Sequence, residues 1–224
     1  MDYILKISDR KTLALCVLKD GTLEVRAPKN LPESAISDFI NKKKDWILKN
    51  TEKMKEREAK KIGFSLNIGD FLLYKGNEYE ILHSDKMMVS FDCNNFYMPE
   101  GVSFEGLKPA LIKLYKKLAR EEIFKKVEYY SKMMNLRPGS VKINSAKTRW
   151  GSCSGKNSLN FSWKLIFADE DTINYVVVHE LAHTKEHNHS PEFWEIVERF
   201  FHDYKECRER LKLLQEKLAV ENWD

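Results

Sequence analysis

The stretch that decides the fold runs from Asn174 to Trp194 and reads NYVVVHELAHTKEHNHSPEFW. His179 and His183 are four residues apart, so on a helix both imidazoles project from one face and can reach one ion. Glu180 lies beside the first histidine, where its carboxylate can take a proton from a water molecule whose pKa a zinc ion lowers to roughly 7. This HExxH pattern on an apolar helix predicts a zinc-dependent hydrolase with Glu180 as general base.

A third metal ligand is expected among the histidines that follow. His187 would lie about 12 Å along a continuous helix from His179, because an α-helix rises about 1.5 Å per residue, and that is too far to share one ion. The chain must turn first, and Ser190-Pro191 is a typical helix start. His189 lies in that turn and can swing back, so we predict the ligands His179, His183 and His189. The fourth position is then left for water, which is typical of a catalytic zinc site.

The composition of the chain fits a globular protein, since 42% of its 224 residues are hydrophobic and 32% are charged. Apolar runs are too short to span a bilayer, and the charged N-terminal segment does not read as a signal peptide. We therefore expect a cytoplasmic protein without a membrane partner. Four scattered cysteines without a CxxC pair argue against a zinc ribbon or a disulfide scaffold. A net charge of +4 is only mildly basic, so nucleic acid is not an expected partner.

Hydrophobic periodicity gives a β-rich first half and a helix-rich second half, which predicts an α+β fold. We expect residues 1–105 to form a β-rich region with one long helix, and residues 106–224 to form the catalytic domain. Asp20-Gly21 and Lys75-Gly76-Asn77 are hairpin signals, and the Lys/Glu-rich segment 42–61 predicts a solvated helix. The expected strands are 2–7, 12–18, 22–27, 70–75, 78–83, 86–91, 95–98, 141–145, 148–153 and 158–163, and the expected helices are 33–60, 107–135, 169–186, one starting at Ser190-Pro191, and 204–219.

The histidine spacing equals that of the metzincin peptidases, but two features argue against that family. Glu186 stands where the metzincin motif has glycine. All seven methionines lie at or before Met134, so no methionine is available for the turn that follows the metzincin histidines. A metzincin is therefore not expected.

A second block of sequence carries a closer resemblance. Residues 147–154 read KTRWGSCS, and they precede the histidine segment and the pair Phe193-Trp194. Together these motifs resemble the YgjP-like (DUF45) family of metal-dependent hydrolases, which is placed among the zincin-like metallopeptidases. The resemblance implies a minimal zincin-like core, with a small sheet, the HExxH helix and C-terminal helices. It puts the metal ligands on His179, His183 and His189 and implies a peptidase, while also admitting a nucleoside-triphosphate pyrophosphatase.

Two further residues are candidates for catalysis, each with a plainer alternative. Arg149 can contact an anionic part of the substrate or stabilise an oxyanion, or it can form a structural ion pair. Tyr175, one turn before His179, can donate to a developing oxyanion or orient a ligand, or it can simply pack. Strand 158–163 is expected as an edge strand to which a peptide substrate could add.

Three functions remain open at this point. The first is a zinc metallopeptidase with a peptide substrate and Glu180 as base. The second is a metal-dependent nucleoside-triphosphate pyrophosphatase or phosphohydrolase, with Arg149 holding phosphates and Mg²⁺ or Mn²⁺ as the working ion. The third is a nucleic-acid-associated binding protein with a structural metal. Glu180 and the open fourth position count against the third, and the lack of a Gly-rich phosphate loop counts against the second.

Overall fold

The computed structural model describes residues 2–223, and contacts between Cα atoms divide these into two compact units. The first comprises residues 2–64 and 219–222, and the second comprises residues 65–218 and 223. The boundary expected near residue 105 lies inside the second unit, so the strands before residue 105 that follow Ser65 group with the helix-rich half. Within residues 2–223, no helix combines the length and apolar character needed to cross a membrane.

The first unit is a three-stranded sheet packed against helical segments. The central strand pairs in parallel with the first strand and antiparallel with the second. The turn between the second and third strands uses Gly21 at φ 84°, as the hairpin signal predicted. Buried Glu24 binds Lys6 and Arg26, and these pairs lower its pKa. The elements are β1 (Tyr3–Ser8), β2 (Ala14–Val17), β3 (Leu23–Pro28), α1 (Glu33–Lys42) and α2 (Lys44–Ile62).

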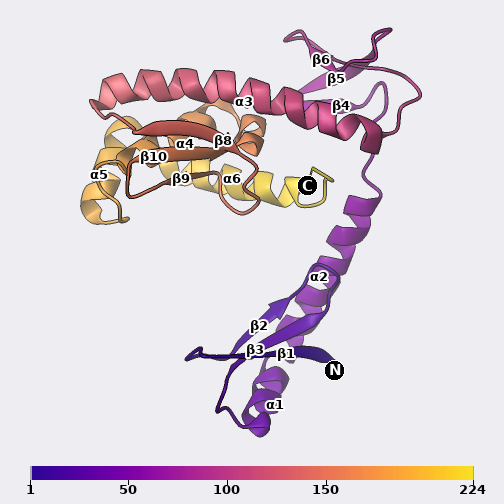
Figure 1. Ribbon diagram of the computed structural model, residues 1–224, viewed down its shortest axis with the longest axis vertical. Coiled ribbons are helices and arrows are strands. Elements are labelled where there is room, and N and C mark those ends of the chain that lie inside the picture. The colour runs from indigo at the N-terminus through magenta and orange to yellow at the C-terminus, as the bar shows by residue number, and fades with distance from the viewer. Residues whose placement is uncertain (1, 224) are drawn as a thin grey trace. The chain divides into compact units, whose positions relative to one another are not determined.

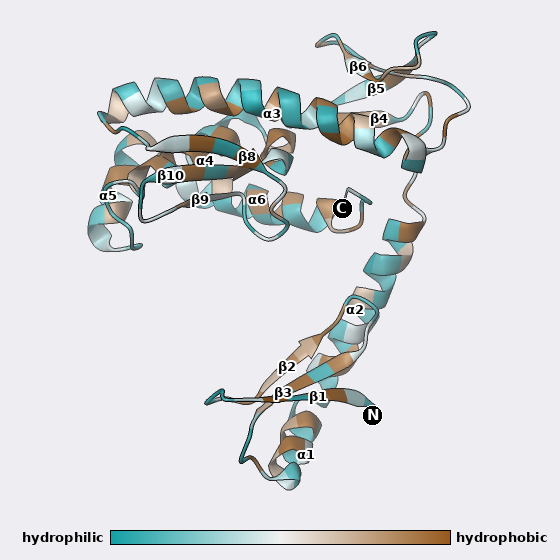
Figure 2. Cartoon of the chain, viewed as in Figure 1, coloured by the Kyte–Doolittle hydropathy of each residue, from teal (hydrophilic) through white to brown (hydrophobic). Residues whose placement is uncertain are grey.

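The single helix predicted over 33–60 is wrong, because the chain bends at Lys43 between α1 and α2. Ile36, Ile40 and Ile47 from the two helices share one core with β3. A straight helix would separate the first and last of these by about 16 Å along its axis, too far to bury both on a short sheet. Tertiary packing therefore decides the break. Ile47 is the one buried residue described in α2, and Figure 2 colours this helix mostly as hydrophilic, as its lysines and glutamates predicted.

The second unit begins with a four-stranded sheet in the order β4-β5-β7-β6. Tyr74 pairs with Asn77, so only Lys75 and Gly76 lie between β4 and β5. Both have positive φ, 49° and 78°, as in the type I′ turns that suit two-residue hairpins, and the predicted hairpin is confirmed. The strands are β4 (Phe71–Tyr74), β5 (Asn77–His83), β6 (Ser90–Phe91) and β7 (Phe96–Met98).

A long helix, α3 (Phe104–Met134), then lies alongside a three-stranded sheet and the helices that follow (Figure 1). Ser103 caps its start, and Asn135 ends it in the left-handed conformation at φ 53°. The sheet contains β8 (Ser140–Asn144), β9 (Gly151–Cys153) and β10 (Ser158–Ser162) in the order β8-β10-β9. The prediction that strand 158–163 is an edge strand is wrong. β10 pairs on both sides, and Leu159 and Phe161 are fully buried.

The remaining elements carry the histidines: the 3-10 helix η1 (Trp163–Phe167), α4 (Glu170–Ala182), α5 (Pro191–Phe200) and α6 (Tyr204–Leu218). Asp169 caps α4 by accepting a hydrogen bond from the Thr172 amide. α4 ends at Ala182, four residues earlier than predicted. The fold class is therefore the predicted α+β, with sheets in the first part, a long helix, and a small sheet followed by C-terminal helices.

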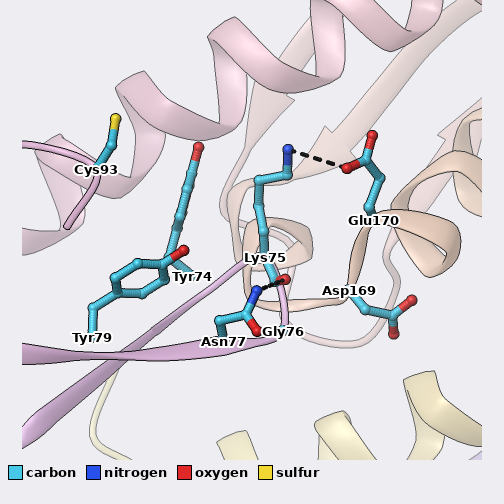
Figure 3. A pocket seen from close by; sticks show the side chains of 8 residues that line it. All are labelled: Tyr74, Lys75, Gly76, Asn77, Tyr79, Cys93, Asp169 and Glu170. Carbon is cyan, nitrogen blue, oxygen red and sulfur yellow. Dashed lines mark hydrogen bonds and ion pairs between the residues drawn. The ribbon is translucent and has the colours of Figure 1, made fainter.

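The β4–β5 turn anchors the start of α4. The amides of Lys75 and Gly76 donate to the carbonyls of Ile166 and Phe167, at 2.8 and 3.2 Å. The Lys75 ammonium lies 3.0 Å from Glu122 of α3 and 3.6 Å from Glu170 of α4. Figure 3 shows the polar pocket of about 480 Å³ beside this turn, with Lys75 directed at Glu170. The residues lining this pocket include none of the candidate metal ligands.

The Gly76→Ala substitution should destabilise the protein by about 1–3 kcal/mol, because it combines a positive φ with a close contact. A Cβ at this position would lie 2.9 Å from the Cα of Asp169. Gly69→Ala is the matched control, since Gly69 has φ 89° but no atom within 4 Å of the added Cβ. Urea unfolding followed by tryptophan fluorescence measures both variants. Equal losses of unfolding free energy would contradict the proposed packing of this turn on α4.

Candidate metal centre

Three histidines from α4 and the turn that follows it converge. His179 lies in α4, His183 is the residue that caps its end, and His189 lies just before α5. One ring nitrogen from each lies within 4.8 Å of the others. The Nε2 atoms of His179 and His189 are 3.2 Å apart. The structure thus brings together the three residues that the sequence predicted as ligands, and exposed His187 is not in the group.

The turn after α4 both redirects the chain and orients a ligand. The carbonyl of Glu186 lies 2.9 Å from Nδ1 of His183, so an Nδ1–H can donate to it. That hydrogen bond leaves the Nε2 lone pair of His183 free for an ion. Ser190 then starts α5 by accepting from the Phe193 amide, with Pro191 in the first turn, as predicted.

Aromatic rings of α5 hold the three imidazoles. The Phe193 ring is fully buried and stacks on His183 with centroids 4.4 Å apart. It also lies 4.9 Å from the rings of both His179 and His189. Trp194 stacks on His189 at 5.7 Å. The sequence identifies this pair as part of the family resemblance, but the ring contacts depend on the geometry of the turn and could not be predicted.

Tyr175 contacts a ligand from the side away from the other histidines. Its hydroxyl oxygen lies 3.4 Å from Nδ1 of His179, whose Nε2 faces His189. Burial raises the pKa of Tyr175 to about 12, so the hydroxyl stays neutral. Of the two active roles considered for Tyr175, this arrangement favours orienting His179 over donating to an oxyanion.

Glu180 is a buried acid whose side chain lacks a full set of partners. Its side chain is buried, and no residue among 2–223 hydrogen-bonds its Oε2 atom. Burial raises its pKa to about 8, although the positive charge of Arg149 acts in the opposite direction. A buried polar atom without a partner usually marks a missing water, ion or substrate. The acid therefore lies ready for a group that the protein itself does not supply.

Burial also favours the neutral form of two of the imidazoles, those of His179 and His183. It lowers the pKa of His179 to about 3, with smaller effects in the same direction from the charges of His183, His189 and Arg208. The pKa of His183 is lowered as well, again mainly by burial. A neutral imidazole offers a lone pair to a cation. Three converging imidazoles beside an unpartnered acid fit a divalent ion with nitrogen ligands, and zinc is the usual one.

The close approach of β9 to Glu180 explains why the block 147–154 has a glycine at position 151. A Cβ on Gly151 would lie 2.5 Å from Oε1 of Glu180, closer than any real contact. Only glycine therefore lets β9 pass so near the acid. Cys153 lies two residues further on, and burial together with the Glu180 charge raises the pKa of its thiol. A protonated thiol is a weak nucleophile, so Cys153 is poorly suited to be the catalytic group.

A match to a known protein family covers most of the chain, from residue 11 to residue 213. The chain belongs to the YgjP-like metallopeptidase domain family. The comparison with curated proteins finds no match. Among solved structures, the domain is similar to the metallopeptidase zymogen abylysin of Pyrococcus abyssi, with 25% identity, coverage of 44% of this chain and 97% of that chain, and a TM-score of 0.39. It is also similar to the zymogen jannalysin of Methanocaldococcus jannaschii, with 27% identity, coverage of 42% and 96%, and a TM-score of 0.37.

Two arginines of the YgjP-like domain flank the histidines. Arg149 precedes β9 and is exposed. It forms no ion pair with any residue between 2 and 223, so the structural ion pair considered as its alternative role is not seen. Arg208 of α6 was missed by the sequence reasoning. Its guanidinium lies over the Trp194 ring, 5.8 Å from the centroid, and its charge reaches both His179 and Tyr175. No sequence signal identifies Arg208, because it meets the site only through the packing of α6.

Purified YgjP-like domain should carry about one zinc ion per chain, and His189→Ala should lose most of it, because two ligands bind far more weakly than three. His187→Ala is the control, since this exposed histidine lies outside the group and should leave the metal content unchanged. Elemental analysis after zinc loading and dialysis measures all three proteins. Retention in His189→Ala, or loss in His187→Ala, would show that the ligand set is wrong.

Gly151→Ala should displace the Glu180 side chain and lower hydrolytic activity by about 10-fold or more while zinc content is retained. The control is Gly155→Ala in the neighbouring turn, where an added Cβ has no atom within 4 Å. Turnover and zinc content are measured for both variants. Normal turnover in Gly151→Ala would mean that β9 does not constrain the acid.

Proposed function

We propose that this YgjP-like domain is a zinc-dependent metallopeptidase in which Glu180 is the general base. The observation that carries the proposal is the buried Glu180 carboxyl, whose Oε2 has no partner among residues 2–223, beside three converging histidines. A structural zinc site normally uses four protein ligands and needs no adjacent acid. Three ligands and a free acid are the arrangement expected for hydrolysis.

The chemistry assigned to the protein's own groups is proton transfer and positioning. Zinc held by the three histidines would lower the pKa of a water molecule and polarise the scissile carbonyl. Glu180 accepts the proton of that water and delivers it to the leaving amine. Burial leaves the pKa of Glu180 at about 8 even with the charge of Arg149 nearby, and the charge of a bound zinc ion would lower it further, so that the carboxylate could act as a base near neutral pH. Tyr175 and Phe193 keep His179 oriented during both transfers.

The free edge of β9 supports a peptide substrate. β9 pairs with β10 and with no other strand among residues 2–223. An extended peptide can add to such an edge through main-chain hydrogen bonds. Gly151 of β9 faces the Glu180 carboxyl, so a peptide added there would run past the base. β9 therefore takes the role first assigned to strand 158–163.

The alternative functions have less support. Mg²⁺ and Mn²⁺ prefer oxygen ligands, whereas this group offers three imidazoles, which counts against the nucleotide phosphohydrolase. The unpaired Arg149 is the feature that favours it. A structural metal in a nucleic-acid-binding protein leaves the buried Glu180 without a purpose.

All four cysteines are free thiols, which suits the expected reducing compartment, the cytoplasm.

Glu180→Gln should keep its zinc and lose peptidase turnover by about 10²–10⁴-fold, because the amide cannot accept the proton. Glu186→Gln is the matched control, since Glu186 serves the site through its backbone carbonyl. Zinc content and cleavage of unfolded casein are measured together, with nucleoside triphosphates tested in parallel. Undiminished cleavage by Glu180→Gln would remove it as the base. Hydrolysis of nucleotides but not of casein would replace the peptidase assignment.

A further inference from the structure

Arg208 is held over the edge of the metal centre by an aromatic ring. Its guanidinium lies 5.8 Å from the centroid of the Trp194 ring. That ring in turn stacks on His189 at 5.7 Å and lies 6.0 Å from His179. Tyr204, one turn before Arg208 on α6, stacks on Trp194 at 4.8 Å and fixes its plane. One indole ring therefore separates the cation from two of the histidines.

The neighbouring charged residues of α6 form ion pairs, whereas Arg208 has no carboxylate partner among residues 2–223. Arg210, two residues further along α6, binds Asp169 at 3.1 Å and Glu206 at 3.3 Å. Glu209 on the same helix binds Lys212 instead. Within residues 2–223, no carboxylate pairs with Arg208, although acidic side chains are plentiful on α6. An exposed arginine that is fixed on a ring and left unpaired is well placed to meet a charge from outside.

We infer that Arg208 binds a carboxylate of the peptide substrate and so sets the specificity of the enzyme. The inference rests on the proposed peptidase function. A guanidinium can bind a carboxylate through two parallel hydrogen bonds. Because stacking on Trp194 already restricts the Arg208 side chain, less side-chain entropy is lost when the carboxylate binds. The carboxylate can come from an acidic side chain near the scissile bond or from the C-terminus of a short peptide. Arg208 is distinct from Arg149, whose charge acts on Glu180 from the β9 side.

The test compares Arg208→Gln with wild type on short alanine-rich peptides containing one phenylalanine. In each peptide, one position beside the phenylalanine carries either Glu or Gln. Each of these peptides is made with a free C-terminus and again with an amidated C-terminus. Arg120→Gln is the matched control, because Arg120 also lies over an aromatic ring, 4.9 Å from the Phe124 centroid, but on α3. Arg208→Lys keeps the charge and loses the paired geometry. The readout is the ratio of kcat/KM for matched peptides within each enzyme, which is insensitive to the fraction of folded protein.

Wild type should prefer one carboxylate-bearing series by about 10- to 100-fold, and Arg208→Gln should abolish the preference, mainly through KM. Arg208→Lys should keep part of it, and Arg120→Gln should keep all of it. A Glu-over-Gln preference assigns the site to an acidic side chain, whereas an acid-over-amide preference assigns it to the C-terminus. Cleavage without either preference, or a preference that survives in Arg208→Gln, overturns this inference and leaves the peptidase standing. Absence of cleavage by zinc-loaded wild type, with nucleotides hydrolysed instead, overturns both.

Discussion

The close approach of three imidazoles is the constraint on which the rest of this domain depends. The Nε2 atoms of His179 and His189 lie 3.2 Å apart, although ten residues separate them in the chain. Such an approach requires that the helix end at Ala182, that the turn reverse, and that Ser190 start the next helix at once. It also requires low charge on the rings, which burial provides by lowering the pKa of His179 to about 3. Phe193 completes the arrangement by touching all three rings.

Without a bound ion, the same burial would give His179 and Glu180 opposing effects on stability as the pH changes. The lowered pKa of His179 makes the unfolded chain bind more protons below its ordinary pKa of 6.5, so this group reduces stability as the pH falls from there toward 3. The raised pKa of Glu180 makes the folded chain bind more protons, so its contribution is complete below 4.5 and is lost as the pH rises toward 8. The pH range from about 3 to 6.5, in which His179 reduces stability, overlaps the range from 4.5 to about 8, in which Glu180 does. At every pH from about 3 to about 8, at least one of the two groups therefore reduces the stability of the folded protein. A bound divalent cation relieves both, because it takes the imidazole lone pairs and offsets the carboxylate charge.

The sequence predicted the parts of the site that depend on local rules. The spacing of His179 and His183, the turn before Ser190 and the left-handed positions in the Lys75-Gly76 hairpin are all properties of short segments. The central position of β10 was not predictable in this way. β10 pairs in parallel with β8, and β9 lies between these two strands in the sequence. Gly151 stood in a recognisable block, but its purpose became evident only when Glu180 was placed beside it. Arg208 carried no signal at all, since its neighbour Trp194 lies in another helix.

Helix α6 makes contacts at both ends of α4, the helix that contains His179. Arg210 of α6 binds Asp169, the residue that caps the start of α4, at 3.1 Å. Two residues earlier, Arg208 reaches the Trp194 ring that stacks on His189 beyond the far end of α4. At its start α4 is also tied to α3 and the β4–β5 turn, through Glu170, whose carboxylate pairs with Lys126 and lies near Lys75. A helix fixed in this way cannot slide along its axis without breaking these ion pairs or its cap. The position of α6 relative to the histidines is therefore fixed by contacts at both ends of α4. This places the Arg208 guanidinium, which is stacked on Trp194, at a defined position beside them.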